Sequence, residues 1–262
     1  MSLAYTLTLY YACGGGMAGR WAGAILSTAA LATVIAGAYV LNDVFDLEVD
    51  RGSPRRHPIA AGKVSRRDAS VLAALLLAGG LGVAAMCRAS FLVCLAAVAA
   101  GLALYDFLSK HLGAGKQIFV AALITSIYPL ALTQAGGATG SRAATLAVFP
   151  VWMFLTSFGY EVLKDLRDRS TDPQIAGRPT LIRRRPVLWR RISAGVVAVA
   201  SLLLIVPAFL GCRWVYMAIA AVAMALAMVA SFVKVRLAIR LVYAECLLVG
   251  IAAAADVAVF GM

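Results

Sequence analysis

The most regular feature of the chain is a series of long apolar stretches separated by short polar segments. Each stretch comes close to the roughly 20 mainly apolar residues that a helix needs to cross a membrane. The nine apolar segments cover residues 2–18, 21–44, 69–87, 90–108, 117–135, 143–162, 192–211, 214–233 and 238–260. The first is the weakest, because polar residues and the run Gly14-Gly15-Gly16 interrupt it. The pattern predicts an all-α membrane protein with nine transmembrane helices in one bundle.

The composition agrees with this pattern and excludes a soluble globular domain. Hydrophobic residues make up 63% of the chain and charged residues only 14%, whereas soluble chains carry about 25% charged residues. No long linker rich in Pro, Ser or Gly divides the sequence, so we expect a single domain over residues 1–262. The cysteines lie in or beside apolar segments without a C-x-x-C pair, which favours packing roles over a disulfide or zinc framework.

The positive charges are distributed unevenly between the two sides of the predicted membrane. Of the 24 Lys and Arg residues, 20 fall in polar segments on the side reached after the second, fourth, sixth and eighth apolar segments. The positive-inside rule places that side in the cytoplasm, with the N-terminus inside, and predicts a multi-pass protein of the cell (inner) membrane. The net charge of +12 therefore favours anionic lipid as a neighbour. A nucleic-acid partner is disfavoured, because the cations are spread over membrane loops.

Two acidic clusters with the same spacing end the second and the sixth apolar segments. Each follows the pattern D-x2-D-x3-D, and together they contribute half of the 12 acidic residues: Asp43, Asp46, Asp50, Asp165, Asp168 and Asp172. Positions i, i+3 and i+7 share one face of a helix, so each cluster is predicted to form a carboxylate stripe. A separation of four helices indicates two four-helix halves followed by a ninth helix. The longest polar loops follow the two clusters, which places the chemistry on this side.

The chemistry of these clusters favours divalent cations. Carboxylates about 5 Å apart repel by roughly 3 kcal/mol at an effective dielectric constant of 20, so they need neutralisation. Asn42, the only asparagine of the chain, directly precedes the first cluster. Carboxylate and amide oxygens, completed by substrate phosphates, are ligands that Mg²⁺ prefers. The alternative, in which the acids only cap or solvate helix ends beside arginines, accounts poorly for two clusters of identical spacing on one membrane face.

With these two acidic clusters, the chain resembles a known family. The segment from Asn42 to Asp50 has the form N-D-x-x-D-x-x-x-D, and residues 165–172 repeat D-x-x-D-x-x-x-D. Two such motifs after the second and sixth of nine helices resemble the UbiA superfamily of intramembrane prenyltransferases over nearly the whole chain. Residues 51–62 are similar to its R-P-(I/L)-x-x-G segment, with His57 in place of the usual arginine. Residues 105–110 are similar to its Y-x-x-x-x-K motif.

The resemblance implies a magnesium-dependent transferase that ionises an isoprenyl diphosphate to an allylic carbocation. Two Mg²⁺ ions would be held by residues of the two motifs: Asn42, Asp43, Asp46, Asp50, Asp165, Asp168 and Asp172. The residues implied in catalysis are Asp46, Asp168, Tyr105 and Lys110. Arg51, Lys110 and Lys164 are the candidates that neutralise diphosphate oxygens. The partners implied are the diphosphate donor, a lipophilic or aromatic acceptor, and membrane lipid.

The carbocation needs a dry, aromatic surrounding, and several aromatic residues lie in suitable helices. The candidates are Tyr105, Tyr128, Trp152, Phe154, Phe158 and Tyr160. Ordinary helix packing is the alternative for each of them except Tyr105, which falls in a matched motif. Two further acids lie in apolar segments, where ionisable residues often have a function. We expect Glu245 to form a structural ion pair near Arg240, with a role in the active site as the alternative, and Asp256 to lie at the membrane interface.

The acceptor side departs from the family pattern. Family members usually carry an Arg-Pro pair before the first helix that helps to bind the acceptor, and residues 1–5 contain no such pair. The short connection from Asp50 to Pro58 resembles members that act on digeranylgeranylglyceryl phosphate precursors, chlorophyllides or homogentisate. An intramembrane terpene cyclase, which needs no acceptor, is the main alternative. A polyprenyl-lipid transporter or scaffold is more remote, since the acids lie at a membrane edge, not at the midplane.

Overall fold

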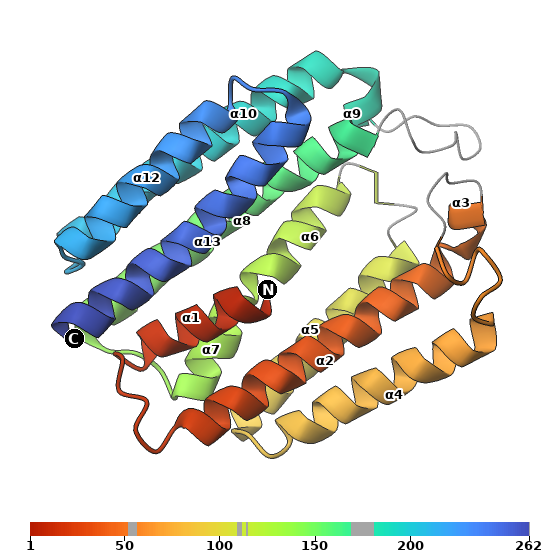
Figure 1. Ribbon diagram of the computed structural model, residues 1–262, viewed down its shortest axis with the longest axis horizontal. Helices are drawn as coiled ribbons and strands as arrows, with labels where there is room; N and C mark the ends of the chain where they lie inside the picture. Colours follow the sequence, from red (N-terminus) through yellow and green to blue (C-terminus); the bar gives the residue numbers. More distant parts are fainter. Residues whose placement is uncertain (52–56, 109–111, 114, 169–180, 262) are drawn as a thin grey trace.

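The computed structural model describes residues 1–51, 57–108, 112–113, 115–168 and 181–261. Within these ranges the chain forms helices and no strands. Long helices run roughly alongside one another and form a bundle (Figure 1). Seven helical segments are long and apolar enough to cross a membrane: α2 (Trp21–Phe45), α4 (Arg66–Ala84), α5 (Ala89–Leu108), α6–α7 (Gly115–Ala135), α8 (Gly140–Arg167), α10–α11 (Pro186–Phe209) and α13 (Val235–Phe260). The protein is therefore an integral membrane protein.

The first and the eighth predicted segments form shorter helices. These are α1 (Ser2–Ala12) and α12 (Trp214–Ala230). At a rise of about 1.5 Å per residue, α1 is too short to span a bilayer alone. Its early end agrees with the polar interruption after residue 12.

Other segments are subdivided. The fifth is split at Ser126 into α6 (Gly115–Thr125) and α7 (Ile127–Ala135). The seventh consists of α10 (Pro186–Leu202), a 3₁₀ turn (Leu203–Ile205) and α11 (Val206–Phe209). Two short helices, α3 (Leu47–Arg51) and α9 (Leu181–Arg184), accompany the polar segments that follow α2 and α8.

Glycines allow the closest helix contacts in the bundle. A Cβ atom on Gly80 of α4 would lie 2.7 Å from a side-chain carbon of Val34 on α2. A Cβ atom on Gly159 of α8 would lie 2.5 Å from Val197 on α10. The Ser193 hydroxyl donates a hydrogen bond of 2.9 Å to the Gly159 carbonyl across the same contact. Without a hydrophobic driving force between helices in lipid, such small residues favour association through close packing.

The centre of the main hydrophobic core is aromatic. The ring of Phe149 on α8 lies 6.0–6.4 Å from those of Tyr11, Tyr128, Trp152 and Tyr216, measured between centroids. All five side chains are buried. They come from α1, α7, α8 and α12, so this cluster joins the N-terminal helix to the C-terminal part of the bundle.

Asp256 near the end of α13 stabilises the start of α12. Its carboxylate accepts hydrogen bonds from the backbone N–H groups of Arg213 and Tyr216, at 2.9 and 3.0 Å. These N–H groups belong to the first turn of α12 and have no partner within the helix. The Asp256 side chain is completely buried. Asp256 therefore serves as a buried helix cap, and its expected position at the membrane interface stays a prediction.

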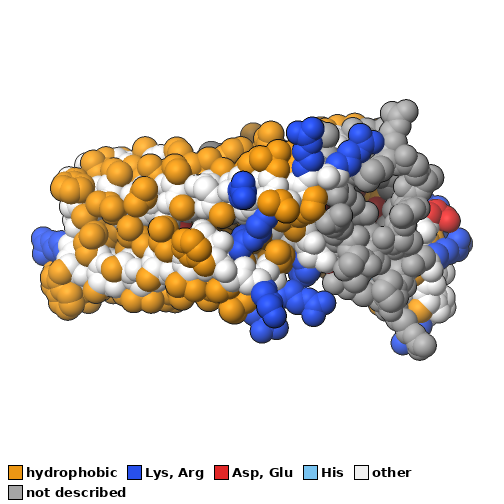
Figure 2. All heavy atoms as spheres, turned by 90° about the horizontal axis from the view of Figure 1, so that it is seen from above, with side chains coloured by type: hydrophobic (Ala, Val, Ile, Leu, Met, Phe, Trp, Pro, Cys, Tyr) orange, Lys and Arg blue, Asp and Glu red, His pale blue; other side chains and the backbone are white. Residues whose placement is uncertain are grey.

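The two acidic motifs lie at the same end of the bundle. Figure 1 shows the C-terminal ends of α2 and α8 at that end, beside α3 and α9. In the face seen in Figure 2, blue Lys and Arg side chains gather toward the same end, while orange apolar side chains cover the rest of the bundle. Between the two motif-bearing helices, α5 packs on α2, α6 packs on α5, and α8 packs on α6.

Candidate active site

The first acidic motif lies where helix α2 ends. Asp43 is in the last turn, and Asp46 is the C-cap residue, with φ −92° and ψ 7°. The N–H of Asp46 still donates to the Asn42 carbonyl at 2.8 Å. The expected stripe along one continuous helix is wrong for this motif, because α2 stops at Phe45. Asp50 belongs to the separate helix α3, and its side chain lies outside the described part of the structure.

The second motif repeats this local geometry. Asp165 lies in the last turn of α8, and Asp168 is the C-cap residue, with φ −82° and ψ 0°. Its N–H points to the Lys164 carbonyl, four residues earlier, as that of Asp46 points to Asn42. Asp172 lies outside the described residues. In both motifs, therefore, the first aspartate occupies the last helical turn and the second the cap.

The first motif contacts helix α5 through Asn42. The Asn42 side-chain amide donates a hydrogen bond of 3.0 Å to Oδ1 of Asp106, whose side chain is buried. Asp46 lies close enough to Asp106 for the two carboxylates to repel each other. On the other side, Asp43 Oδ1 lies 3.8 Å from Nδ1 of His57. The first motif thus collects three carboxylates and one amide.

The second motif is held by donors from α6 and α8. Gln117 of α6 donates from Nε2 to Oδ2 of Asp165 at 2.5 Å, and Lys116 Nζ lies 4.0 Å from Oδ1 of the same carboxylate. Arg167 donates two hydrogen bonds of 2.7 Å to the two oxygens of Asp168. Such paired contacts are among the stronger charge-assisted interactions in proteins. Both described carboxylates of this motif are therefore accompanied by cations of the chain.

Helices α5 and α6 connect the two motifs. The ring of Tyr105 on α5 stacks on Phe119 of α6, with centroids 5.9 Å apart. The Tyr105 hydroxyl also lies within hydrogen-bonding reach of Lys116. Their chain neighbours Asp106 and Gln117 contact the first and the second motif, respectively. Helices α5 and α6, with Tyr105 of the matched motif, therefore form a bridge between the two helix ends that carry the acidic motifs.

Two of the cations predicted to bind diphosphate, Lys164 and Arg51, have carboxylate partners of their own. Lys164 Nζ lies 2.9 and 3.0 Å from the two oxygens of Glu161, which is buried one turn earlier on α8. Arg51 is largely exposed and lies 3.2 Å from Glu48. Lys110 lies outside the described residues. The roles of these three in diphosphate binding remain predictions.

Four residues of the site were missed in the sequence: Asp106, Lys116, Gln117 and Glu161. Asp106 and Glu161 carried a usable signal, because the chain has only 12 acidic residues and these two lie within the apolar segments 90–108 and 143–162. Lys116 and Gln117 carried none, since their role depends on how α6 packs between α5 and α8.

The oxygen ligands at the first motif fit a magnesium ion. Within the described ranges, no three acidic, histidine or cysteine side chains lie close enough together to form a complete metal cage. Mg²⁺ does not need one, because it is commonly held by one or two carboxylates together with substrate phosphates and water. Asn42 uses its amide nitrogen on Asp106, which leaves its carbonyl oxygen for a ligand. With the carboxylates of Asp43 and Asp46, this gives an all-oxygen set.

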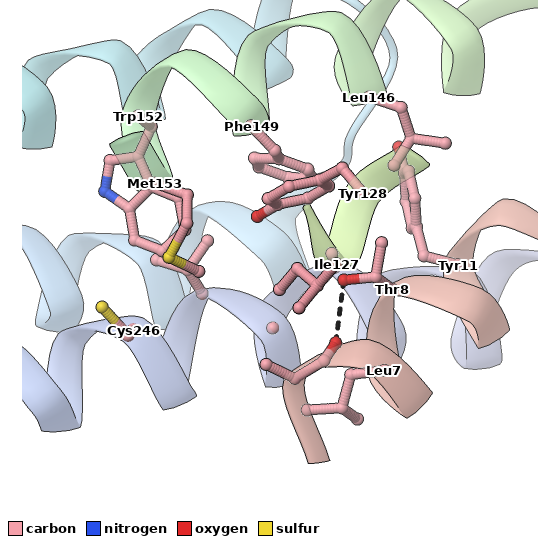
Figure 3. Close-up of a pocket in the computed structure, with 14 residues that line it drawn as sticks. Leu7, Thr8, Tyr11, Ile127, Tyr128, Leu146, Phe149, Trp152, Met153 and Cys246 are labelled. Atoms are coloured by element: carbon pink, nitrogen blue, oxygen red, sulfur yellow. Dashed lines mark hydrogen bonds between the residues drawn. The ribbon is translucent and has the colours of Figure 1, made fainter. Parts of the chain in front are cut away.

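A pocket lies deeper in the bundle (Figure 3). Tyr11, Tyr128, Phe149, Trp152 and Met153 are among its lining residues, and they come from α1, α7 and α8. Trp152 precedes Asp165 by 13 residues on α8, so the pocket begins about 20 Å from the second motif at 1.5 Å per residue.

Of the aromatic residues predicted to surround the substrate, Tyr128 and Trp152 line this pocket. Tyr105 lies at the motifs instead. Phe154, Phe158 and Tyr160 are half-buried and do not belong to the pocket lining.

Glu245 on α13 lies beside this pocket. It is completely buried and accepts a hydrogen bond of 3.0 Å from the indole nitrogen of Trp152. The expected ion pair with Arg240 is wrong, because Arg240 is exposed while Glu245 faces α8. Its second oxygen, Oε2, has no hydrogen-bond partner among the described residues. The next residue, Cys246, lines the pocket.

Comparison with known proteins identifies the family. The sequence pattern of the UbiA prenyltransferase family matches residues 2–240. The chain belongs to the UbiA prenyltransferase family. As a member, it is an enzyme of the prenyltransferase class.

Several archaeal enzymes are similar to this UbiA protein in sequence. It is 30% identical over 218 residues to the digeranylgeranylglyceryl phosphate synthase of Methanopyrus kandleri, a match covering 81% of this chain and 77% of that enzyme. It is 37% identical over 172 residues to the enzyme of the same name from Halobacterium salinarum, covering 64% of this chain and 58% of that enzyme.

Structures of UbiA proteins share its fold. An apo UbiA homologue from Aeropyrum pernix superposes with a TM-score of 0.76 at 19% identity, covering 98% of this chain and 97% of that one. A UbiA homologue from Archaeoglobus fulgidus, bound to GPP and Mg²⁺, gives a TM-score of 0.72 at 16% identity, covering 98% and 96%. At these identities the likeness is one of fold, and it confirms the UbiA resemblance derived from the paired motifs.

Proposed function

We propose that this UbiA protein transfers a prenyl group from an isoprenyl diphosphate to a lipophilic or aromatic acceptor. The observation that carries the proposal is the repeated helix-end geometry of the two acidic motifs at one end of the bundle. The GPP and Mg²⁺ bound to the Archaeoglobus homologue support the donor class and the metal. The names of the archaeal relatives make a glyceryl phosphate lipid the first acceptor to test.

Two Mg²⁺ ions are proposed, one for each motif. Asn42, Asp43, Asp46 and Asp50 would hold the first, and Asp165, Asp168 and Asp172 the second. When bound, the ions neutralise charge on the diphosphate leaving group. Asp46 and Asp168, at the two helix ends, are the ligands that we propose matter most for catalysis.

Basic residues of the chain would bind the remaining diphosphate oxygens. Lys116 is added to the predicted set of Arg51, Lys110 and Lys164, because it lies beside both Tyr105 and Asp165. Lys164 is partly exposed while Glu161 is buried, so the ammonium group can turn from Glu161 toward a phosphate oxygen. These contacts orient the diphosphate and stabilise it as it leaves.

The reaction itself requires one bond to break and one to form. The C1–O bond of the donor breaks, and its electron pair leaves with the diphosphate. The allylic cation then takes an electron pair from an oxygen or carbon of the acceptor, which loses a proton. Tyr105, fixed against Phe119 beside the second motif, offers a ring to the cation. The apolar bundle interior excludes water and takes the prenyl tail.

The same observations support a proposed arrangement in the membrane. We infer one domain over residues 1–262, with nine helices arranged as two four-helix halves and a ninth helix. The motif end faces the cytoplasm of a cell (inner) membrane, with the N-terminus inside. The gathering of Lys and Arg toward that end supports this orientation. The acids at the bundle end also argue against a transporter, whose binding sites lie near the midplane.

One observation favours a terpene cyclase as a second candidate. The pocket combines Tyr128, Phe149 and Trp152 with the neighbouring carboxyl of Glu245, about 20 Å from the second motif along α8. Aromatic faces and a carboxyl at that depth would suit a cation that migrates along the prenyl tail. The archaeal relatives favour the transferase.

One experiment separates the two candidates. Purified full-length protein is incubated with Mg²⁺ and farnesyl or geranylgeranyl diphosphate, with and without geranylgeranylglyceryl phosphate. Prenylated acceptor is expected, with little release of diphosphate when the acceptor is absent. Cyclic hydrocarbons formed without acceptor would show that the protein is a cyclase and not a transferase. If neither donor is consumed with any acceptor, the proposed function is wrong.

A further inference from the structure

Each acidic motif is contacted by one buried polar residue from the α5–α6 bridge. Asp106 of α5 accepts from the side-chain amide of Asn42, and Gln117 of α6 donates to Asp165. The exposed fractions are only 5% for Asp106 and 2% for Gln117. Burial removes water as a competing partner, so these hydrogen bonds fix the side chains that they contact. Neither buried residue belongs to the acidic motifs.

The Asp106 contact determines how Asn42 is oriented. An amide side chain has a donor end and an acceptor end, and a carboxylate binds only the donor end. Because Nδ2 of Asn42 donates to Asp106, its Oδ1 is not used on that carboxylate. A carbonyl oxygen is the only part of an asparagine that ligates Mg²⁺. The buried acid therefore selects the orientation of Asn42 that suits a metal.

Gln117 has the reciprocal effect on the second motif. Its Nε2 holds Oδ2 of Asp165, and Lys116 approaches the other oxygen at 4.0 Å. The carboxylate is thereby fixed at the end of α8, one turn before Asp168. The two contacts are alike in type, since each joins an amide nitrogen to a carboxylate oxygen. In the first contact the amide belongs to the motif, and in the second the carboxylate does.

We propose that Asp106 and Gln117 are positioning residues that orient Asn42 and Asp165 for divalent-cation binding without contacting the cation. The proposal rests on the proposed function, in which both motifs bind metal. It adds two residues from α5 and α6 to a site built from α2 and α8. It also explains why a carboxylate and an amide are buried beside motifs that already contain ligands of both types.

The test uses Mn²⁺ as a probe for the metal site. Its binding to purified full-length protein in detergent micelles is measured by electron paramagnetic resonance. Loss of a residue that orients a metal ligand typically weakens metal binding by about 10–100-fold. We expect Asp106→Leu and Gln117→Leu to fall in this range. Asp106→Asn keeps an acceptor for Nδ2 of Asn42, so its affinity is expected to stay within about threefold of wild type.

A matched control is Ser201→Ala, which removes the hydrogen bond that another fully buried residue, Ser201, donates to the Ala198 carbonyl on α10. It should leave Mn²⁺ binding unchanged. Equal losses in Asp106→Asn and Asp106→Leu would overturn the proposal for Asp106, because the charge itself would then be needed. Unchanged binding in both leucine variants, whatever their thermal stability, would show that the two residues are only structural.

A double-mutant cycle shows whether Asp106 acts through Asn42. In an Asn42→Ala background, Asp106→Leu should change the Mn²⁺ affinity by less than about twofold, because the oriented group is already gone. Additive losses would contradict the proposal. The turnover of prenyl diphosphate by wild-type protein is recorded in the same preparations. Metal binding without any turnover would count against the proposed function. The Mn²⁺ affinities of the variants would still decide the positioning proposal.

Discussion

The two acidic motifs share their spacing and their backbone geometry but not their surroundings. In both, one aspartate lies in the last turn of a helix and the next at its cap. Around the first motif, Asp106 adds another carboxylate, and the imidazole of His57 lies 3.8 Å from Asp43. Around the second, Arg167 binds Asp168 through two hydrogen bonds and Lys116 approaches Asp165.

This difference shows that a repeated motif specifies a backbone and not an electrostatic environment. Among the described residues, Asp106 adds negative charge beside the first motif. The second motif is already compensated by its own basic side chains, so a cation there must displace or share them. We therefore expect the basic side chains of the second motif, Arg167 above all, to weaken metal binding there when no diphosphate is present.

The largest effect is expected when either cap aspartate is removed. Asp46→Ala and Asp168→Ala should each reduce kcat by about 10²–10³-fold, since each removes a group that stabilises the leaving diphosphate. Prenyl transfer measured with saturating Mg²⁺ and donor checks this. Activity retained in both variants would contradict the metal assignment of both motifs. A large loss in only one would make the two motifs unequal in catalysis as well as in charge.

A change away from both motifs should affect stability and not metal binding. Trp152→Phe removes the indole N–H and leaves Glu245 buried without its hydrogen bond. The free energy of unfolding should fall by about 1–3 kcal/mol. Thermal unfolding in detergent, monitored together with Mn²⁺ binding, tests this. Glu245→Gln is the companion variant, because its amide oxygen can still accept from Trp152 and should largely preserve stability.

The compensation at the second motif can be tested by removing its closest cation. Arg167→Ala releases both oxygens of Asp168. Mn²⁺ affinity in the absence of substrate should rise several-fold. Hydrogen bonds to charged groups are typically worth about 1.5–3 kcal/mol, and in the variant the metal no longer has to replace those between Arg167 and Asp168. Arg184→Ala, an exposed arginine on α9, serves as a control for the loss of positive charge. Weaker binding in Arg167→Ala would show that the arginine supports the metal site instead.

The smallest effect is expected at the end of the first motif. Arg51→Gln breaks the exposed contact with Glu48, and such pairs contribute about 0–1 kcal/mol to stability. Thermal stability and Mn²⁺ binding should be nearly unchanged. A several-fold increase in KM for the donor, with those two properties intact, would support the role of Arg51 in binding diphosphate. An unchanged KM would remove it from the site.

The sequence predicted the helices better than the contacts between them. The long apolar stretches located the nine helical segments of the described residues, because lipid-facing and packed residues are both apolar in a membrane helix. They did not reveal that α2 ends at Phe45, since residues 43–50 contain no proline or glycine that would break a helix. The partners Asp106, Lys116 and Gln117 depend on the packing of α5 and α6, which no local pattern encodes.

The buried acids show the same limit. Glu245 and Asp256 stood out as polar residues in apolar segments, but the partner of each lies more than 35 residues away in sequence. The sequence neighbour Arg240 was therefore a misleading guide to Glu245. In each case the hydrogen-bond partner comes from another helix, Trp152 of α8 or the first turn of α12.

Arg190 has a consequence for how the protein sits in lipid. Its guanidinium, from α10, donates to the carbonyls of Ala230, Ser231 and Val233 at the end of α12. With 17 residues, α12 reaches only about 26 Å, less than the roughly 30 Å hydrocarbon thickness of a typical bilayer. Its terminal carbonyls would otherwise face acyl chains without water. The Arg190 guanidinium satisfies these carbonyls in place of water. The short helix α12 can therefore be kept there without thinning the surrounding leaflet.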